Sequence, residues 1–469
     1  MILTHQLIGH GLTFQDVGAD WKTHQYSTAD VVGMVHAYKN LLQHTYHCRP
    51  GQRVVIALAA SVSQVALMFA CAELALTIVI VDHEAPHGGA LRDYIYKETQ
   101  TLLPIDFLFI ESQDRLQSRS KFSVYQEICD TTVILQECEL DYLPNHTVWA
   151  QDNTKLIVFN SSGKSCPTVV SHTHHFIVSL ALRNSKQFCG TVGMCFNLQH
   201  GSSLATYFLP ALMSTAVTGM INFQAKESDP EYFVRISKHC MNHLMIPYGS
   251  MLFRFFEDCQ DHANPELVIH TLGFISPSYL PYLNRGRAQN VVSIFGSGET
   301  SGAVFVNQLL PFEQFDPRRY YKVDNFYEIS LDDNGIMTVC VPQHNLKVVT
   351  NDCFEYQNNS YYYRGRADLV RINNWPVDLD RYNDMVGVIA GKNCGEIVLD
   401  LVEDCMYLVT WTAPNLTKQQ LDSLNYQLGH TSGWAHKILK YAALDPATYR
   451  NNTEQTLQYF RQFVPCINT

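Results

Sequence analysis

The sequence predicts an α/β protein with a large N-terminal domain of doubly wound sheets and a small α+β domain behind it. Short β-branched runs alternate with helical patterns over most of the chain, which is typical of parallel sheets covered by helices. After Gly365 the pattern changes to two strand-like runs and one helical run. A chain of 469 residues is too long for a single core, so two or three domains are expected. The change of pattern divides the chain into two, 1–367 and 368–469.

The first elements alternate between helix and strand. Ser27 or Thr28 is suited to cap a helix with apolar residues at helical spacing. Gln64 and Glu73 interrupt the apolar stretch 54–81, so we interpret it as strand, helix and strand rather than as a membrane span. The expected helix, strand, helix and strand cover residues 27–42, 53–58, 61–76 and 77–81.

The same rhythm continues along the chain. Apolar runs that end in Gly-containing loops are where open α/β sheets place their ligands. The first such run leads through a Ser/Gly loop into a helix expected from about residue 173. Strands are expected at 155–159, 216–223 and 291–295, and in the small domain strands at 396–402 and 405–411 precede a helix at 416–428.

Composition narrows the class of function. The net charge is −11 and no Lys/Arg cluster is present, which argues against nucleic-acid binding. The 14 cysteines are scattered without metal-ligand spacing, as expected for free thiols in a reducing compartment. The first residues lack the features of a signal peptide, so a cytoplasmic protein without a membrane span is expected.

Three separated segments carry residues suited to nucleotide chemistry. A Ser/Gly/Lys loop directly after a strand offers hydroxyls, a flexible glycine and a positive charge for phosphates. Glu299 follows a strand-like run in a Gly/Ser loop, and Asp352 precedes a Gly-Arg-Ala-Asp segment. The residues of the first loop are Ser161, Ser162, Gly163, Lys164 and Ser165.

In this order, the segments resemble the phosphate loop, the glutamate motif and the ribose and hinge motif of the adenylate-forming superfamily, which includes acyl- and aryl-CoA synthetases. The resemblance implies a large N-terminal domain and a small mobile C-terminal one. It also implies use of ATP and Mg²⁺ to join a carboxylic acid to AMP with release of pyrophosphate. The phosphate loop continues as Pro-Thr-Val-Val, as in phenylacetate-CoA ligase-like members.

The resemblance assigns roles around the nucleotide. Residues 161–165 would contact the phosphates, and Glu299 would hold Mg²⁺. Phe295 takes the position of an aromatic that stacks on adenine. Thr300 would supply a hydroxyl that Gly298 lacks. Asp352 would bind the ribose.

Further roles follow from the same resemblance. Arg366 would reach the nucleotide, and Asp368 takes the hinge position. Lys437, in an amphipathic run with helix-like spacing, would bridge the substrate carboxylate and the α-phosphate as a compact charge, with Lys440 as the alternative. The substrate pocket would include His200 and Gly273.

The acceptor and the activity leave alternatives open. Coenzyme A is the commonest acceptor in the superfamily, but Asn374 replaces a glycine that leaves room for the pantetheine arm, which weakens the inference to coenzyme A. A carrier-protein thiol, an acceptor enzyme or an amine are the alternatives. An aryl or acyl acid fits better than an amino acid, because Asn197 stands where amino-acid-activating members carry an aspartate. The shortened phosphate loop, Gly298, Asn374 and His436 favour a different hypothesis, a catalytically impaired relative that binds nucleotide. Backbone or solvent contacts are expected for His172, His174 and His175 rather than metal ligation.

Overall fold

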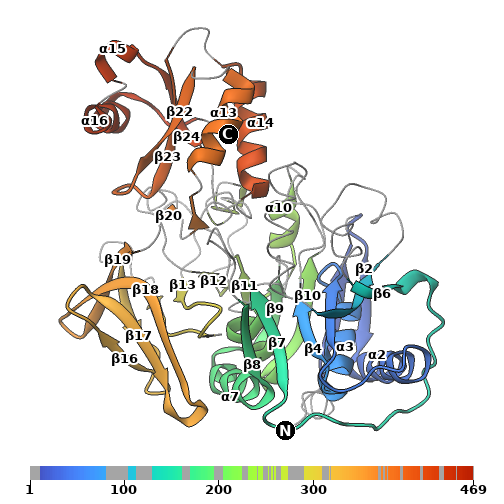
Figure 1. Ribbon diagram of the computed structural model, residues 1–469. Helices are drawn as coiled ribbons and strands as arrows, with labels where there is room; N and C mark the ends of the chain where they lie inside the picture. Colours follow the sequence, from blue (N-terminus) through green and yellow to red (C-terminus); the bar gives the residue numbers. More distant parts are fainter. Residues whose placement is uncertain are drawn as a thin grey trace.

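The chain forms several sheets with helices between and around them (Figure 1). The computed structural model describes residues 11–18, 20–80, 104–111, 129–160, 169–194, 204–223, 231–239, 241–246, 252, 255–256, 258–259, 266–272, 290–300, 302–308, 316, 318–367, 371–372, 375–377, 379–390, 394–411, 416–431, 438–449 and 452–467.

One six-stranded sheet has the strand order β6-β5-β3-β4-β7-β8. Strands β3 to β7 pair in parallel, and β8 is antiparallel to β7. Along β3, Val54 and Ile56 face one core while Val55 and Ala57 face another, as expected for a sheet that is buried on both sides. The strands are β3 (Arg53–Ala57), β4 (Thr77–Ile80), β5 (Ile105–Ile110), β6 (Cys129–Ile134), β7 (Lys155–Asn160) and β8 (Val169–Thr173).

A 13-stranded sheet begins with a parallel half. Strand β1 lies between β10 and the antiparallel edge strand β2, and β10, β9, β11, β12 and β13 follow in parallel. These strands are β1 (Thr13–Val17), β2 (Thr23–Ser27), β9 (Gly190–Met194), β10 (Val217–Phe223), β11 (His243–Met245), β12 (Val268–Leu272) and β13 (Asn290–Phe295).

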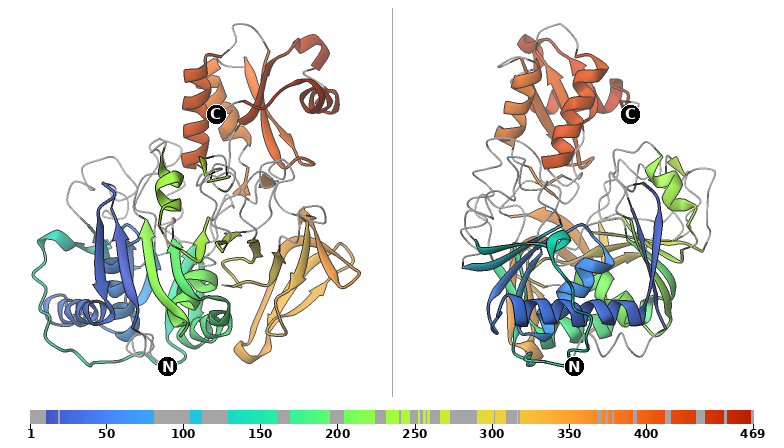
Figure 2. Two further views of the ribbon diagram at one scale, coloured as in Figure 1. Left: turned by 180° about the vertical axis from the view of Figure 1, so that it is seen from behind. Right: turned by 90° about the vertical axis from the view of Figure 1, so that its right-hand side faces the viewer.

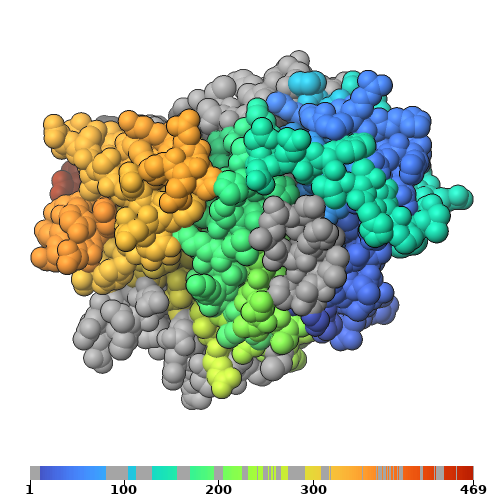
Figure 3. Space-filling view, turned by 90° about the horizontal axis from the view of Figure 1, so that it is seen from below, coloured from blue at the N-terminus to red at the C-terminus, as the bar shows by residue number. Residues whose placement is uncertain are grey.

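The second half of that sheet is antiparallel and runs on from β13. Its strands are β14 (Phe305–Gln308), β15 (Arg319–Lys322), β16 (Glu328–Leu331), β17 (Ile336–Val341), β18 (Leu346–Gln357) and β19 (Ser360–Arg366), with the turn η7 (Pro342–His344) between β17 and β18. Seen from below, the green elements around α7 (His174–Asn184) lie between this half and the blue N-terminal elements (Figure 3).

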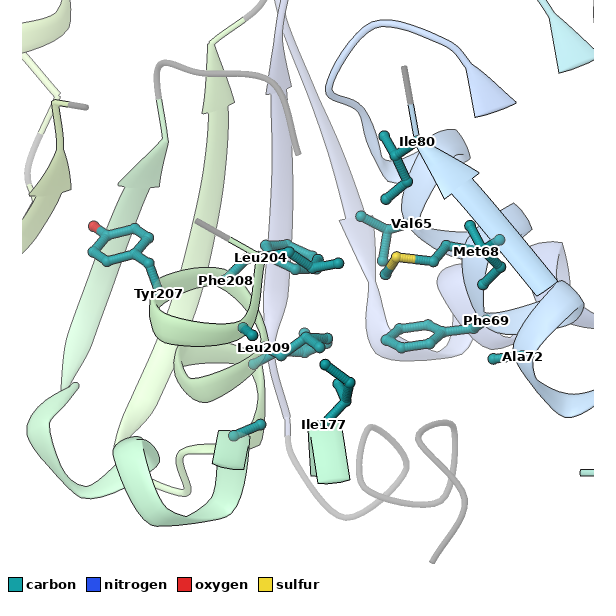
Figure 4. Packing of buried hydrophobic residues seen from close by; sticks show 14 of the residues in the cluster. Val65, Met68, Phe69, Ala72, Ile80, Ile177, Leu204, Tyr207, Phe208 and Leu209 are labelled. Atoms are coloured by element: carbon teal, nitrogen blue, oxygen red, sulfur yellow. The ribbon is translucent and has the colours of Figure 1, made fainter. Parts of the chain in front are cut away.

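Helix α3 (Val62–Glu73) lies between the two large sheets. Almost all its residues are buried, as expected for a helix that is apolar on every side. Its Val65, Met68 and Phe69 face Ile177 of α7 and Leu209 of α9 (Leu209–Met213) (Figure 4). The interpretation of 54–81 as strand, helix and strand is confirmed, and no helix of the described chain is both long and apolar enough to cross a membrane.

Other helices cover the same two sheets (Figure 1). Helix α2 begins with Ser27 as its cap, because the Ser27 hydroxyl accepts from Asp30 N and the Asp30 carboxylate accepts from Ser27 N. The helices and helical turns are α2 (Thr28–Asn40), η1 (Leu41–Thr45), η2 (Leu135–Glu137), α7 (His174–Asn184), η3 (Ser185–Gln187), η4 (Leu204–Phe208), α9 (Leu209–Met213) and α10 (Tyr232–Ser237).

Buried polar contacts fix α3 at both ends. At its N-terminus, the Asp16 carboxylate on β1 accepts from Val62 N at 3.0 and 3.1 Å and from Asn222 Nδ2 at 2.9 Å. At its C-terminus, Lys39 Nζ donates to the Glu73 carboxylate at 2.7 Å, with both side chains almost fully buried. Breaking such a pair by removing one partner typically costs about 3–5 kcal/mol.

The C-terminal elements form a separate three-stranded sheet with its own two cores (Figures 1 and 2). Helices α13 and α14 cover one face, and α16 covers the other, where Phe460 stacks on Tyr407 and Arg461 pairs with the buried Asp400. The elements are β20 (Arg371–Ile372), β21 (Trp375–Pro376), α13 (Leu379–Ala390), β22 (Gly395–Asp400), β23 (Cys405–Thr410), α14 (Lys418–Thr431), β24 (Ile438–Ala443), α15 (Pro446–Tyr449) and α16 (Thr453–Phe463). The boundary at 367/368 stays a prediction.

Two local predictions need correction. The helix expected from about residue 173 is confirmed as α7, which Thr173 caps, but the chain does not reach it directly from the Ser/Gly loop, because β8 comes first and forms an antiparallel hairpin with β7. The run after Lys437 is the strand β24 and not a helix. Its register against β23 shifts at Leu439, so Ile438 and Tyr441 face one core while Leu439 and Ala442 face the other. This bulge gives a strand the i, i+3 spacing that is usual for a helix.

A buried histidine pair makes a prediction about stability. His243 Nδ1 lies 3.1 Å from His270 Nε2, and burial lowers the pKa of His243 to about 4 and that of His270 to about 3. Unfolded histidines titrate near 6.5, so below that pH the unfolded chain binds protons that the folded chain does not. The stability that depends on these neutral histidines is therefore fully present above about pH 6.5. Below that pH the free energy of unfolding falls, by about 1.4 kcal/mol per pH unit for the fully buried His270.

Urea unfolding of wild type and His270→Phe from about pH 7 to about pH 5 tests this expectation. The slope of unfolding free energy against pH gives the number of protons taken up on unfolding, and in the variant this number should be smaller by about one. Phe188→Leu, at a ring that packs against both histidines and does not titrate, serves as the control and should keep the wild-type slope. Equal slopes in wild type and His270→Phe would contradict the assignment.

Candidate functional site

The loop after β13 carries Glu299 at the carboxyl end of a parallel strand, where open α/β sheets bind ligands. Its turn is closed from within, because Ser297 N donates to Thr300 Oγ1 at 3.0 Å and Thr300 N donates to Ser297 Oγ at 3.3 Å. Thr300 Oγ1 in turn lies 3.1 Å from Ser297 O. Glu299 is only half-buried, so its carboxylate is the acidic group that this turn presents.

Glycines allow the loop to close on itself. A Cβ at Gly296 would lie 2.1 Å from the Gly302 carbonyl oxygen, so only glycine fits there without a backbone shift. A Cβ at Gly298 would meet nothing within 4 Å. The loop therefore requires the first glycine for its shape, whereas Gly298 leaves open space where the superfamily motif carries a hydroxyl.

The hairpin of the phosphate loop contacts the Glu299 loop directly. His172, on β8, places Nε2 2.7 Å from Gly298 O. Burial lowers the His172 pKa, while the bond to Gly298 and the charge of Glu299 act in the opposite direction. His172 makes the backbone contact expected for the three histidines, and among the residues that the structure describes no group of three or more His, Cys, Asp or Glu side chains is arranged to hold a metal ion.

Asp352 and Arg366 are brought together by strand pairing. They are register partners on β18 and β19, at the end of this hairpin away from its turn. Asp352 is buried, and its N–H donates to Thr350 Oγ1 at 3.2 Å. Gly365 pairs with Cys353, next to a register shift between β18 and β19. Its φ of +113° is a backbone conformation that favours glycine.

Phe295 and Thr300 are both used inside the protein. The Phe295 ring is 3% exposed and lies 5.1 Å from the Phe354 ring and 5.3 Å from the Tyr363 ring, centroid to centroid. Thr300 is fully buried, and its hydroxyl bonds within the loop. The predicted contacts of Phe295 with adenine and of Thr300 with nucleotide stay predictions, and both residues first of all support the Glu299 loop.

Several of the residues predicted to form the site lie outside the described chain, so their roles stay predictions. The role of Arg366 also stays a prediction, because only its backbone is described. Lys440, the alternative to Lys437, donates to Phe460 O at 2.8 Å and so helps to attach α16. The predicted residues outside the described chain are Ser161, Ser162, Gly163, Lys164, Ser165, His200, Gly273, Asp368 and Lys437.

Sequence reasoning missed Tyr327 as a support of this site. Its buried hydroxyl donates to Thr300 O at 3.1 Å, and the Arg183 guanidinium lies 5.1 Å from its ring centroid. No local pattern marks the tyrosine, because its partner is 27 residues away.

No protein-family model and no curated protein sequence matches the chain. Solved structures match it in fold. The fatty acid AMP ligase from Legionella pneumophila has a TM-score of 0.71 at 11% identity, with 99% of this chain and 97% of that chain covered. A variant of o-succinylbenzoate CoA synthetase from Bacillus subtilis has a TM-score of 0.66 at 15% identity, with 94% of each chain covered.

A third similar structure is NpsA-ThdA from Klebsiella oxytoca, an artificially fused adenylation and PCP di-domain. It has a TM-score of 0.66 at 13% identity, and the match covers 98% of the present chain and 97% of the di-domain chain. These likenesses show that the chain has the fold of the adenylate-forming enzymes, so the predicted fold is confirmed.

The glycines of the Glu299 loop give a matched test. Gly296→Ala should lower the free energy of unfolding by roughly 1–3 kcal/mol, because the new methyl group must displace backbone. Gly298→Ala should leave it within about 0.5 kcal/mol of wild type, because the methyl group enters open space. Urea unfolding of the two variants measures both values, and a Gly296→Ala variant as stable as Gly298→Ala would contradict the described loop.

Proposed function

We propose that the chain activates a carboxylic acid, aryl or acyl, by joining it to AMP. The observation that carries this proposal is the meeting of the Glu299 loop and the phosphate-loop hairpin at His172 and Gly298, within this fold. The similar structures support it, since one is a fatty acyl-adenylate ligase in complex with acyl adenylate and pyrophosphate. Another is an o-succinylbenzoate CoA synthetase in complex with AMP.

In the reaction, negative charge on the carboxylate and on the α-phosphate must be stabilised as the two groups join. A carboxylate oxygen of the acid forms a bond to the α-phosphorus while the bond to the bridging oxygen breaks, and pyrophosphate leaves with that oxygen. Residues 161–165 would bind the phosphates, and Asp352 and Arg366 would hold the ribose. Lys437 would offset the charge that develops between the carboxylate and the α-phosphate.

The donor chemistry fits a magnesium ion. The Glu299 carboxylate is carried by a half-buried residue on a turn closed by hydrogen bonds, and carboxylate oxygens are ligands that Mg²⁺ prefers. When bound, the ion would neutralise charge on the phosphates.

Transfer to an acceptor would follow. We propose that the C-terminal unit, residues 368–469, turns about Asp368 and exchanges Lys437 for the segment around Asn374. Coenzyme A is the first candidate acceptor, and a carrier-protein thiol is the second. Similar structures with a CoA product analogue and with a fused PCP domain support both.

The test measures AMP and pyrophosphate formed from ATP and Mg²⁺ with aryl, fatty and amino acids, with and without coenzyme A. Lys437→Ala and Glu299→Ala should each lower acid-dependent pyrophosphate release by roughly 100- to 1,000-fold, as expected when one transition-state contact is lost. Their matched controls, Lys418→Ala and Glu328→Ala at exposed positions, should retain the wild-type rate.

The outcomes separate the candidate functions. Repeated turnover that depends on coenzyme A would identify the acceptor, because pyrophosphate leaves before the acceptor is needed. ATP binding without release for any acid would favour the catalytically impaired relative, to which the open space at Gly298 already points. Activation of a free amino acid well above benzoate-like and fatty acids would contradict the proposed substrate class.

A further inference from the structure

His172 and Gly298 connect the two large sheets next to Glu299. The histidine lies on β8 of the six-stranded sheet, and the carbonyl belongs to the loop after β13 of the 13-stranded sheet. A carbonyl oxygen only accepts hydrogen bonds, so His172 Nε2 is the donor in this 2.7 Å contact. Since Gly298 directly precedes Glu299, the bond fixes the peptide on one side of the carboxylate-bearing residue.

A second donor holds the other side. Tyr327 OH donates to Thr300 O at 3.1 Å, immediately after Glu299. Tyr327 is buried, and Arg183 lies over its ring while also pairing with Asp324. The backbone of Glu299 is therefore bracketed by two side-chain donors that reach it from different parts of the chain.

The imidazole of His172 is itself held in place. It is 4% exposed and stacks on Phe176, with ring centroids 5.0 Å apart and an interplanar angle of 27°. Phe176 lies in the first turn of α7 and packs edge-on against His344 at 5.0 Å. A donor that is locked by packing on a rigid element defines the position of its acceptor more closely than a surface side chain does.

We propose that His172 is a positioning residue for Glu299, holding its carboxylate at a fixed place relative to the phosphate-loop hairpin and thereby setting the affinity for the divalent cation. This proposal rests on the proposed function. Strand β8 follows the segment proposed to hold the triphosphate, so the His172–Gly298 hydrogen bond links the strand after that segment to the peptide that precedes the residue proposed to hold the metal. Displacements of about 1 Å in such sites can cost roughly 100-fold in rate.

Two substitutions separate the hydrogen bond from the ring packing. His172→Phe keeps an aromatic ring for stacking on Phe176 and removes the donor. His172→Gln removes the ring and offers an amide N–H in place of Nε2. His175→Phe is the matched control, because this neighbour is exposed and its ring lies against His344.

The first readout is Mn²⁺ affinity in the presence of ATP, which needs no turnover. His172→Phe should weaken Mn²⁺ binding roughly 10-fold, within the range seen when the partners that orient metal ligands are lost. His172→Gln and His175→Phe should stay close to wild type. Wild-type affinity in His172→Phe, or the same loss in Phe and Gln variants, would overturn the proposal.

The second readout is hydrogen exchange at the Ser297 and Thr300 amides, which bond inside the loop. Exchange should become faster in His172→Phe and stay slow in His172→Gln. Unchanged exchange in His172→Phe would overturn the positioning role. If wild type released no pyrophosphate with any acid while Mn²⁺ affinity and exchange changed as expected, the proposed function would fail and the positioning role would stand.

Discussion

The packing of α3 between two sheets is the constraint on which the rest of the molecule depends. Nearly every side chain of this helix is buried, so its diameter sets the distance between the sheets. The phosphate-loop hairpin extends from one sheet and the Glu299 loop from the other. Their separation is therefore decided by an apolar layer that contributes no group to the proposed chemistry.

Buried polar contacts give that layer a single orientation. An apolar helix between apolar sheets is free to rotate or slide at modest cost, because the hydrophobic effect is not directional. Asp16 at the N-terminus of α3 and the Lys39–Glu73 pair at its C-terminus remove this freedom, since any shift would leave a buried charge without its partner. These polar contacts therefore fix the position of α3, and with it the relative position of the two sheets that bear the site.

The proposed chemistry requires rigidity in one place and movement in another. Groups that stabilise a transition state act best when they are already in position. The closed turn at 297–300 and its two external donors meet this requirement. The proposed rotation near Asp368 would then bring groups to a fixed centre, so the moving unit need not shape the metal site.

Local features of the structure could be predicted from the sequence, and contacts between distant segments could not. The Ser27 cap, the strands around α3 and the polar loop after β13 follow from propensity and spacing of neighbouring residues. The strand β24 was missed because a bulge changed its apolar spacing to that of a helix. A backbone contact was expected for His172, but its partner in the Glu299 loop was not, and Tyr327 was missed as a support, because both partners lie far away along the chain.

The pairing of β1 with β10 has a consequence for how the protein is made. Thr13 aligns with Gly219, so the first strand cannot take its place until the chain has grown by more than two hundred residues. At typical synthesis rates this takes roughly 10–40 seconds, during which β1 and the apolar α3 have no second sheet to pack against. The nascent chain therefore carries exposed apolar segments for much of its synthesis, and chaperone binding to this early region would be an advantage on the ribosome.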